Sequence, residues 1–322
     1  MNKNLKPENG HNSLERSRLN EESVLTALHR FGWLPQSQIH SYCWPKDVTP
    51  RSARRTLANL LDLKQVVYRT RTKSREKVYS LSPAGAIRLQ YELGIDAGVL
   101  PDFAKSVDST SFAHRCLAND ITIWWCREQA ELGGTFYTEQ EVISGRAPIR
   151  SAPLSMTHAK GKIPDAVMAL PSRDSSRPNE IWYGWVEVEK GWKNKEDQGS
   201  MVAKLCDVLA LHETRWEIST HSVLKFAMVA CPKPIHENRL TAELRSFFAA
   251  HGQYYDVAYI KKWLFIWRPD GTKIPVGEIM AAEDTLLAEA ALAALNASAE
   301  RARAEVRAVS DMHAKLRAQN GE

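Results

Sequence analysis

Two strand-length apolar runs that carry acidic residues constrain the fold of this chain more than any other feature. The first run is Ile163–Leu170, which begins with a Pro-Asp pair ending at Asp165, and the second is Trp185–Lys190. Turn residues bound both runs, which predicts two strands. In the second strand, alternation directs Glu187 and Glu189 to one side and the two valines to the other. If the strands pair, Asp165 and both glutamates converge on one edge of a sheet.

Carboxylates that lie close together repel one another unless a cation neutralises them. Hard oxygen ligands suit Mg²⁺ or Mn²⁺. Asp165, Glu187 and Glu189 are therefore a candidate metal site, with Lys190 as a neighbouring positive charge. A metal-dependent phosphodiesterase needs such a set, because carboxylates fix the ion and a cation stabilises the attacked phosphate. The alternative is that these acids face solvent on an open sheet surface.

Positive charge is concentrated in one short part of the chain. The net charge is +5 over 322 residues, but residues 49–77 alone hold nine Lys or Arg against two acids, a local excess of +7. Concentrated basic charge favours a polyanionic partner such as DNA. No apolar run reaches membrane-spanning length, and the first residues lack an apolar signal region. We therefore expect a cytoplasmic protein without a membrane partner.

The basic segment lies in an expected domain at residues 21–95, which follows a polar and, we expect, disordered tail at residues 1–20. Helical spacing begins at Glu21, and further helices are expected over Leu34–Trp44 and Arg51–Leu63. Two strands joined by a basic turn come next, over Val66–Arg69 and Lys77–Leu81. This arrangement resembles winged helix-turn-helix domains, in which the third helix enters the major groove of duplex DNA and the hairpin lies along phosphates.

The basic side chains of this domain are its candidate DNA-binding residues. They are Arg51, Arg54, Arg55, Arg69, Arg71, Lys73, Arg75 and Lys77. The alternative is a module for protein contacts whose basic face is only solvated.

Residues 112–275 predict a second domain. Its expected elements are a helix over Phe112–Leu132, a strand over Thr135–Val142, the two acidic strands, a helix over Asn194–Glu213, a strand over Lys225–Cys231, a helix over Thr241–His251 and a strand over Val257–Trp267. Periodicity alone indicates a mixed α+β domain. The order helix, three strands, helix, strand resembles the αβββαβ core of restriction-endonuclease-like nucleases.

The order of motifs along the chain narrows the resemblance to one family. The motifs are His114 with Asn119 and Asp120 on a helix, Glu141 on a strand, the Pro-Asp pair ending at Asp165, Glu187-x-Glu189-Lys190-Gly191, and a later Lys204. Together they resemble the plasmid replication–relaxation family, which includes the MOBC class of relaxases. That family pairs a winged helix with a PD-(D/E)XK-like nuclease domain, and the resemblance covers residues 20–265.

The resemblance implies a ligand set for Mg²⁺ or Mn²⁺. Asp165, Glu187 and Glu189 would be the ligands, with Glu141 as a candidate fourth. His114 is a candidate general acid or base, because an unperturbed histidine pKa of about 6.5 suits proton transfer. A buried histidine bonded to a backbone carbonyl is the alternative for His114.

One position departs from the nuclease motif. The residue two after Glu187, where a catalytic lysine usually lies, is Glu189. Lys190 follows directly but points to the opposite face of a strand. Lys204, one helix later, is therefore a second candidate for the catalytic cation.

The segment 278–322 is rich in alanine, with Glu and Arg, and predicts a C-terminal helix. It is a candidate for self-association or for docking to a relaxosome. The alternative is a single solvated helix.

These features lead to a first hypothesis of a DNA-binding, DNA-nicking protein for mobilisation, conjugation or replication of a plasmid or other mobile element. Its expected partners are duplex DNA at an origin-like site and, as a second candidate, single-stranded DNA. The alternative is a non-enzymatic replication accessory factor or transcriptional regulator whose nuclease fold is degenerate. A host-defence endonuclease that cuts both strands is a third hypothesis.

Overall fold

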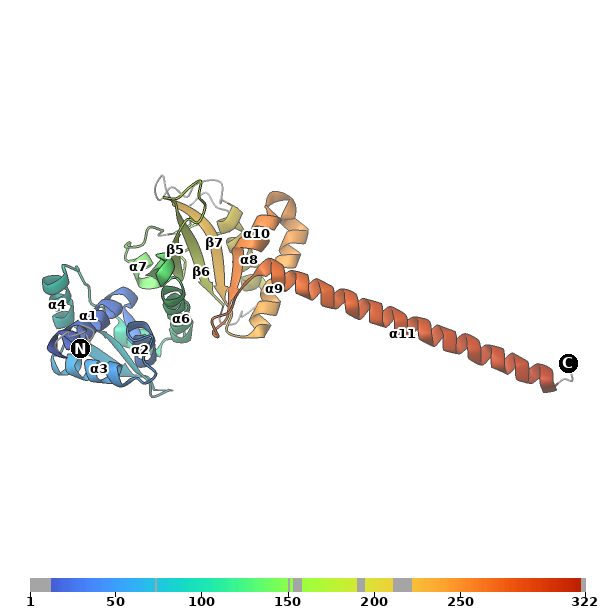
Figure 1. The fold of residues 1–322 in the computed structure, drawn as a ribbon, viewed down its shortest axis with the longest axis horizontal. Coiled ribbons are helices and arrows are strands. Elements are labelled where there is room, and N and C mark those ends of the chain that lie inside the picture. Colours follow the sequence, from blue (N-terminus) through green and yellow to red (C-terminus); the bar gives the residue numbers. More distant parts are fainter. Residues whose placement is uncertain are drawn as a thin grey trace, which may run out of the picture.

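The computed structural model describes residues 13–72, 74–149, 151–152, 158–189, 195–210 and 222–319. Over these residues the chain is a mixed α+β protein with a three-stranded and a six-stranded sheet, so the expected fold class is confirmed at this level. Figure 1 shows both sheets in one body, from which a long helix, α11 (Val276–Gln319), extends. Of the described helices, none is both long and apolar enough to cross a membrane.

The N-terminal unit places helices around a small antiparallel sheet. In chain order its elements are α1 (Ser13–Phe31), β1 (Trp33–Pro35), α2 (Gln36–Cys43), α3 (Arg51–Asp62), β2 (Val66–Thr70), β3 (Lys77–Leu81) and α4 (Pro83–Leu93). Strand β3 lies between β1 and β2 and is antiparallel to both. Leu25 and Leu28 of α1 are buried against Leu57 and Leu60 of α3, in agreement with their helical spacing.

The expectation of disorder up to residue 20 is wrong for residues 13–20. Helix α1 begins at Ser13, and Arg18 pairs with Glu22 one turn later at 2.7 Å. Pairs at this spacing stabilise a helix even where the surface is polar. Residues 1–12 lie outside the described part of the chain.

The second unit is built on the six-stranded sheet. Its elements are α5 (Phe103–Asp108), α6 (Phe112–Glu128), β4 (Thr135–Thr138), α7 (Glu139–Ile143), β5 (Ala166–Pro171), β6 (Ile181–Val188), α8 (Lys195–Ala210), β7 (Ser222–Ala230), α9 (Pro234–His251), α10 (Val257–Trp263), β8 (Leu264–Trp267) and β9 (Lys273–Pro275). The strands follow one another in sheet order from β4 to β9, antiparallel except for the parallel pairs β6–β7 and β7–β8. The expected order helix, three strands, helix, strand is present as α6, β4, β5, β6, α8 and β7, with α7 between β4 and β5.

Helices cover both faces of the larger sheet. On one face, Trp125 of α6 lies over Phe226 of β7 with ring centroids 5.5 Å apart. On the other face, Trp185 of β6 is buried with residues of α8 and α9. Gly184 permits the first packing, because a Cβ at this position would lie 2.0 Å from the ring of Phe226. A residue with a side chain at position 184 would therefore displace the ring of Phe226.

Two expected strands are partly helical. The strand expected over Thr135–Val142 ends at Thr138, where a capping box between Thr138 and Glu141 begins α7. This reciprocal bonding starts a helix regardless of the preceding strand residues. The strand expected over Val257–Trp267 is wrong for its first part, because the side chain of Asp256 caps α10 and only β8 is extended.

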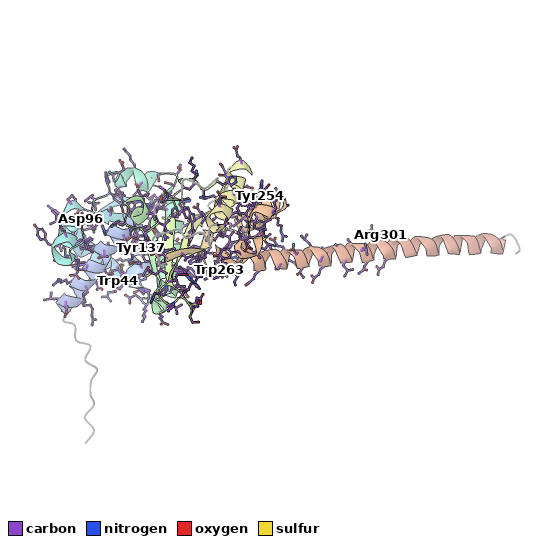
Figure 2. All side chains as sticks on the ribbon, turned by 90° about the horizontal axis from the view of Figure 1, so that it is seen from above. Trp44, Asp96, Tyr137, Tyr254, Trp263 and Arg301 are labelled. Atoms are coloured by element: carbon purple, nitrogen blue, oxygen red, sulfur yellow. The ribbon has the colours of Figure 1, made fainter. Side chains whose placement is uncertain are left out.

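Helix α11 agrees with the helix expected from residue 278 and begins two residues earlier. Its leucines are exposed along the part that leaves the body: Leu286, Leu287, Leu292 and Leu295. Figure 2 shows the same helix from above, with Arg301 on the extended part.

Arg30 of α1 joins the two units through one buried cluster of contacts. Its guanidinium donates to both carboxylate oxygens of Glu141, at 2.9 and 3.2 Å, and to the carbonyl of Phe136 at 2.6 Å. The same group lies 3.9 Å from the centroid of the Phe136 ring. The Thr138 hydroxyl donates in turn to the carbonyl of Arg30.

A second cluster joins α2 to α6. The side chain of Gln38 donates to the carbonyl of Cys116 and to the carboxylate of Asp120, each at 2.7 Å, and accepts from the amide of Asn119 at 3.1 Å. Trp33 stacks on Phe112 at 4.9 Å beside these bonds. Asn119 and Asp120, which belong to the expected motif, therefore connect the two units.

We predict that Arg30→Ala destabilises the protein by roughly 3 kcal/mol, because it leaves Glu141 buried without its cation. Equilibrium urea unfolding measures this change. Arg18→Ala, which removes an exposed pair in the same helix, is the matched control and should leave the midpoint unchanged. An unchanged midpoint for Arg30→Ala would contradict the importance of this contact.

Candidate functional site

The β5–β6 pairing brings Asp165 and Glu187 together. Ala166 pairs with Val186, so the same antiparallel register places Asp165 opposite Glu187. The backbone N–H of Asp165 donates to the carbonyl of Val186 at 3.0 Å, and its carboxylate oxygen Oδ2 accepts from the N–H of Val188 at 2.8 Å. The side chain of Asp165 therefore accepts a hydrogen bond from the backbone of the last residue of β6. This part of the predicted site is present.

Glu187 lies on the α8 side of the sheet and is 7% exposed. Its Oε1 accepts from the indole N–H of Trp185 at 2.6 Å, and its Oε2 forms a salt bridge with Nζ of Lys204 from α8. Burial raises the pKa of Glu187, Lys204 opposes this rise, and the negative charge of Asp165 adds to it. Lys204 therefore occupies the place next to Glu187 that we expected for a catalytic cation.

His114 of α6 reaches the same sheet edge from the other side. Its Nε2 lies 3.3 Å from Oδ2 of Asp165. This hydrogen bond raises the pKa of His114, and burial opposes the rise to a smaller extent. The contact is to a carboxylate, so the alternative of a histidine bonded to a backbone carbonyl is not what the structure shows.

Three residues near this site were not among the expected ones. Trp185 holds Glu187 by the indole bond, and Arg115 lies 3.6 Å from Glu139. Burial raises the pKa of Glu139, and the charges of Arg115, Asp165 and His114 act on it as well. Alternation along the strand already placed Trp185 on the side of Glu187 and could have identified it. Glu139 begins α7, where we expected a strand, so its position near Asp165 could not be predicted.

Other expected ligands lie elsewhere or outside the described residues. Glu141 is in α7 and not on a strand, and its carboxylate is bonded to Arg30 and to the N–H of Thr138. Glu189 follows β6, is 4% exposed, and its N–H donates to the carbonyl of Ala230. Its negative charge acts on the thiol of Cys231. Lys190 lies outside the described residues.

In the described part of the chain, no group of three or more His, Cys, Asp or Glu side chains is placed to hold a metal ion. The pair Asp165 and Glu187 is what the structure brings together. His114 contacts Asp165 and Lys204 contacts Glu187, so the four side chains form a row in which a base lies at each end of the acidic pair. Such a set can hold or move a proton at His114 Nε2 and can present a cation at Lys204.

The expected DNA-binding residues form an exposed basic surface on the N-terminal unit. Arg51, Arg54 and Arg55 project from α3, whose residues Ala53 and Leu57 are buried. Arg69, Arg75 and Lys77 are exposed on the β2–β3 hairpin, and Lys73 lies outside the described residues.

Arg71 differs from the other basic residues of the hairpin. Its guanidinium lies 4.2 Å from the centroid of the Phe112 ring and is only partly exposed. Arg71 therefore contributes to the junction with α6 and is less accessible to a ligand than its neighbours.

Comparison with family models, with curated proteins and with solved structures found no match for this chain.

We predict that His114 titrates above the ordinary histidine pKa of about 6.5 and that Asp165→Asn lowers this value. NMR titration of the histidine ring protons measures both. Because the folded-state pKa is raised, the contact stabilises the fold below the unfolded pKa of about 6.5, and this contribution is lost as pH rises through the raised value.

The matched control for this titration is His114→Gln, which should remove both the titrating signal and the corresponding pH dependence of urea unfolding. A His114 pKa that stays the same in Asp165→Asn would show that Asp165 does not hold the imidazolium.

Proposed function

We propose that this chain is a DNA-binding protein that nicks DNA with Mg²⁺ or Mn²⁺, a relaxase-like protein acting on plasmid or other mobile-element DNA in the cytoplasm. The observation that carries the proposal is the placement of Asp165 opposite Glu187, with Lys204 on Glu187 and His114 on Asp165. In this proposal the N-terminal unit is a winged helix-turn-helix and the second unit is a PD-(D/E)XK-like nuclease domain.

The N-terminal unit supports duplex binding by its element order and its charge. Helices α1, α2 and α3 precede the β2–β3 hairpin, as in a winged helix, and α3 carries Arg51, Arg54 and Arg55 on its exposed side. Within the described residues, none of the basic side chains of α3 or the hairpin forms a salt bridge. Unpaired arginines on an exposed helix are available to phosphates and base edges.

The second unit supports nuclease chemistry by the order of its strands. Strands β4, β5 and β6 are antiparallel neighbours, and β7 is parallel to β6 after the crossover through α8. This is the αβββαβ order that the sequence resemblance implies. The acidic pair lies where β5 begins and β6 ends, with Asp165 partly exposed and Glu187 buried.

In this proposal, two carboxylates at this edge would hold a hard divalent cation. Asp165 and Glu187 supply carboxylate oxygens, and Mg²⁺ is commonly held by one or two carboxylates together with waters and substrate phosphates. A bound ion would polarise the phosphate and stabilise developing negative charge. In the described structure Glu189 is not placed to share one ion with these two acids. The bonds of Glu141 to Arg30 assign Glu141 to the junction.

Lys204 and His114 have roles in the proposed reaction that do not depend on direct metal binding. Once substrate is bound, Lys204 would exchange its contact with Glu187 for one with a phosphate oxygen. This contact would stabilise the pentavalent phosphate. His114 holds a proton at Nε2 against Asp165 and can donate it to a leaving oxygen. Lys190 is the alternative cation.

The second candidate function is non-enzymatic DNA binding by a replication accessory factor or transcriptional regulator. The observation in its favour is that Glu189 occupies the usual lysine position while Lys204 is already bound to Glu187. A stable pair of this kind would keep both groups from substrate.

We predict that Arg54→Ala weakens duplex DNA binding about tenfold and reduces the dependence of the binding constant on salt, because one phosphate or base contact is lost. Fluorescence anisotropy at several salt concentrations measures this. Arg239→Ala, an exposed arginine of α9, is the matched control and should bind as the unaltered protein does. Equal binding by Arg54→Ala would exclude α3 as the contacting helix.

We predict that the protein converts supercoiled plasmid to the nicked form in the presence of Mn²⁺. Asp165→Asn and Glu187→Gln should each lower the rate by a factor of about 100 or more, because each removes a metal-binding charge. Lys204→Met should lower the rate about 100-fold and leave duplex affinity unchanged. Gel analysis of the plasmid forms gives these rates.

The plasmid assay also separates the alternative functions. Linear product from the unaltered protein would favour an endonuclease that cuts both strands. Duplex binding without cleavage in any variant would favour the non-enzymatic regulator. Full activity in Asp165→Asn would refute the proposed site.

A further inference from the structure

A cluster of lysine and aromatic side chains lies at the end of the larger sheet opposite the acidic pair. Nζ of Lys225 in β7 lies close to three aromatic rings, at 5.5 Å from Trp182, 5.6 Å from Tyr259 and 4.8 Å from Trp263. Trp182 is at the beginning of β6, whereas Tyr259 and Trp263 belong to α10. All four side chains are partly exposed.

The cluster continues onto β8 and β9. The ring of Phe265 lies 6.5 Å from that of Trp263, and Nζ of Lys273 lies 4.8 Å from the centroid of Phe265. We use the term aromatic–lysine surface for Trp182, Lys225, Tyr259, Trp263, Phe265 and Lys273. Figure 2 shows Trp263 in the body of the protein, near the point where α11 leaves it.

Within the described residues, neither Lys225 nor Lys273 forms a salt bridge, although the charges of Glu180 and Asp174 act on Lys225. Burial and the nearby charges of Lys262 and Arg177 lower the pKa of Lys225, although Glu180 raises it. The carboxylate of Glu180 is itself bonded to Arg177 and to the indole of Trp182.

This combination of features identifies the class of ligand. Two lysines outside salt bridges, beside a Glu180 that is already bonded to Arg177, favour an anion. Four partly exposed rings favour a ligand with flat faces. Phosphates and unstacked bases supply both features, whereas the bases of a duplex are already stacked on one another. An acidic peptide would use the lysines and leave the rings without a matching contact.

We propose that the aromatic–lysine surface binds single-stranded DNA, with bases on the rings and phosphates on Lys225 and Lys273. The inference deepens the proposed function, because nicking at the acidic pair yields a strand that can be unwound. Trp182 and Glu187 are five residues apart on β6, roughly 17 Å along the strand, and their side chains alternate to opposite faces of the sheet. The displaced strand would reach the aromatic–lysine surface by passing from the Glu187 face to the Trp182 face.

The test is the affinity for a fluorescent thymidine oligonucleotide of about 12 nucleotides, measured by anisotropy without divalent metal. The double variant Lys225→Met, Lys273→Met should bind this strand at least about tenfold more weakly. Lys105→Met, an exposed lysine of α5, is the matched control and should retain affinity. An abasic strand of equal length should bind the unaltered protein about tenfold more weakly than the thymidine strand.

Two outcomes would overturn the proposal: full affinity in the double variant, or equal affinity for the abasic and thymidine strands. Photo-crosslinking of a bromouracil strand to the unaltered protein provides a measurement that is independent of variant folding. Cross-links should map to Trp182, Tyr259 or Trp263, and cross-links confined to the N-terminal unit would refute this surface.

The duplex and nicking assays distinguish this proposal from the proposed function. The double variant should retain duplex affinity, and Arg54→Ala should retain affinity for the single strand. If the unaltered protein neither binds duplex nor nicks plasmid, yet shows the expected strand binding, the proposed function fails and the aromatic–lysine surface stands.

Discussion

The hydrogen bond from the Val188 N–H to the carboxylate of Asp165 fixes the relation on which the candidate site depends. Side chains alternate along a strand, so a slip of one residue between β5 and β6 would turn Glu187 from the α8 side to the α6 side. The bond at the strand end and the pairing of β6 with β7 oppose such a slip. Glu187 is thereby kept beside Lys204, and Asp165 stays within reach of His114.

Helix α6 serves both units of the protein. Its first turn carries His114 to the acidic pair, and Asn119 and Asp120 further along bind Gln38 of α2. Arg30 forms a second contact between the two units, through its salt bridge with Glu141. The two units are therefore joined through the helix that holds His114 by polar bonds that are buried or partly buried.

Much of the fold followed from local signals in the sequence. Apolar spacing located α1, α3, β5 and β6, and strand alternation brought Asp165 and Glu187 to one edge. Glu141 was misplaced because a capping box overrode strand-forming residues, and β1 was missed because three residues give no periodic signal. The roles of Asn119 and Asp120 could not be read from their spacing, since their partner Gln38 lies far away in the chain. Glu189 was expected to share an ion with the other acids, but the described residues place no three such side chains together. Alternation gives the face of a side chain and not its distance from other side chains.

The length of α11 has a consequence for how the protein moves through a solvent. A helix of 44 residues extends about 66 Å at the usual rise per residue. The first turns of this helix pack against α9, and the part beyond Glu283 is a rod that raises the frictional coefficient above that of a sphere of 36.3 kDa. The monomer should therefore elute early from a sizing column and sediment slowly, so that its Stokes radius alone would suggest a larger assembly.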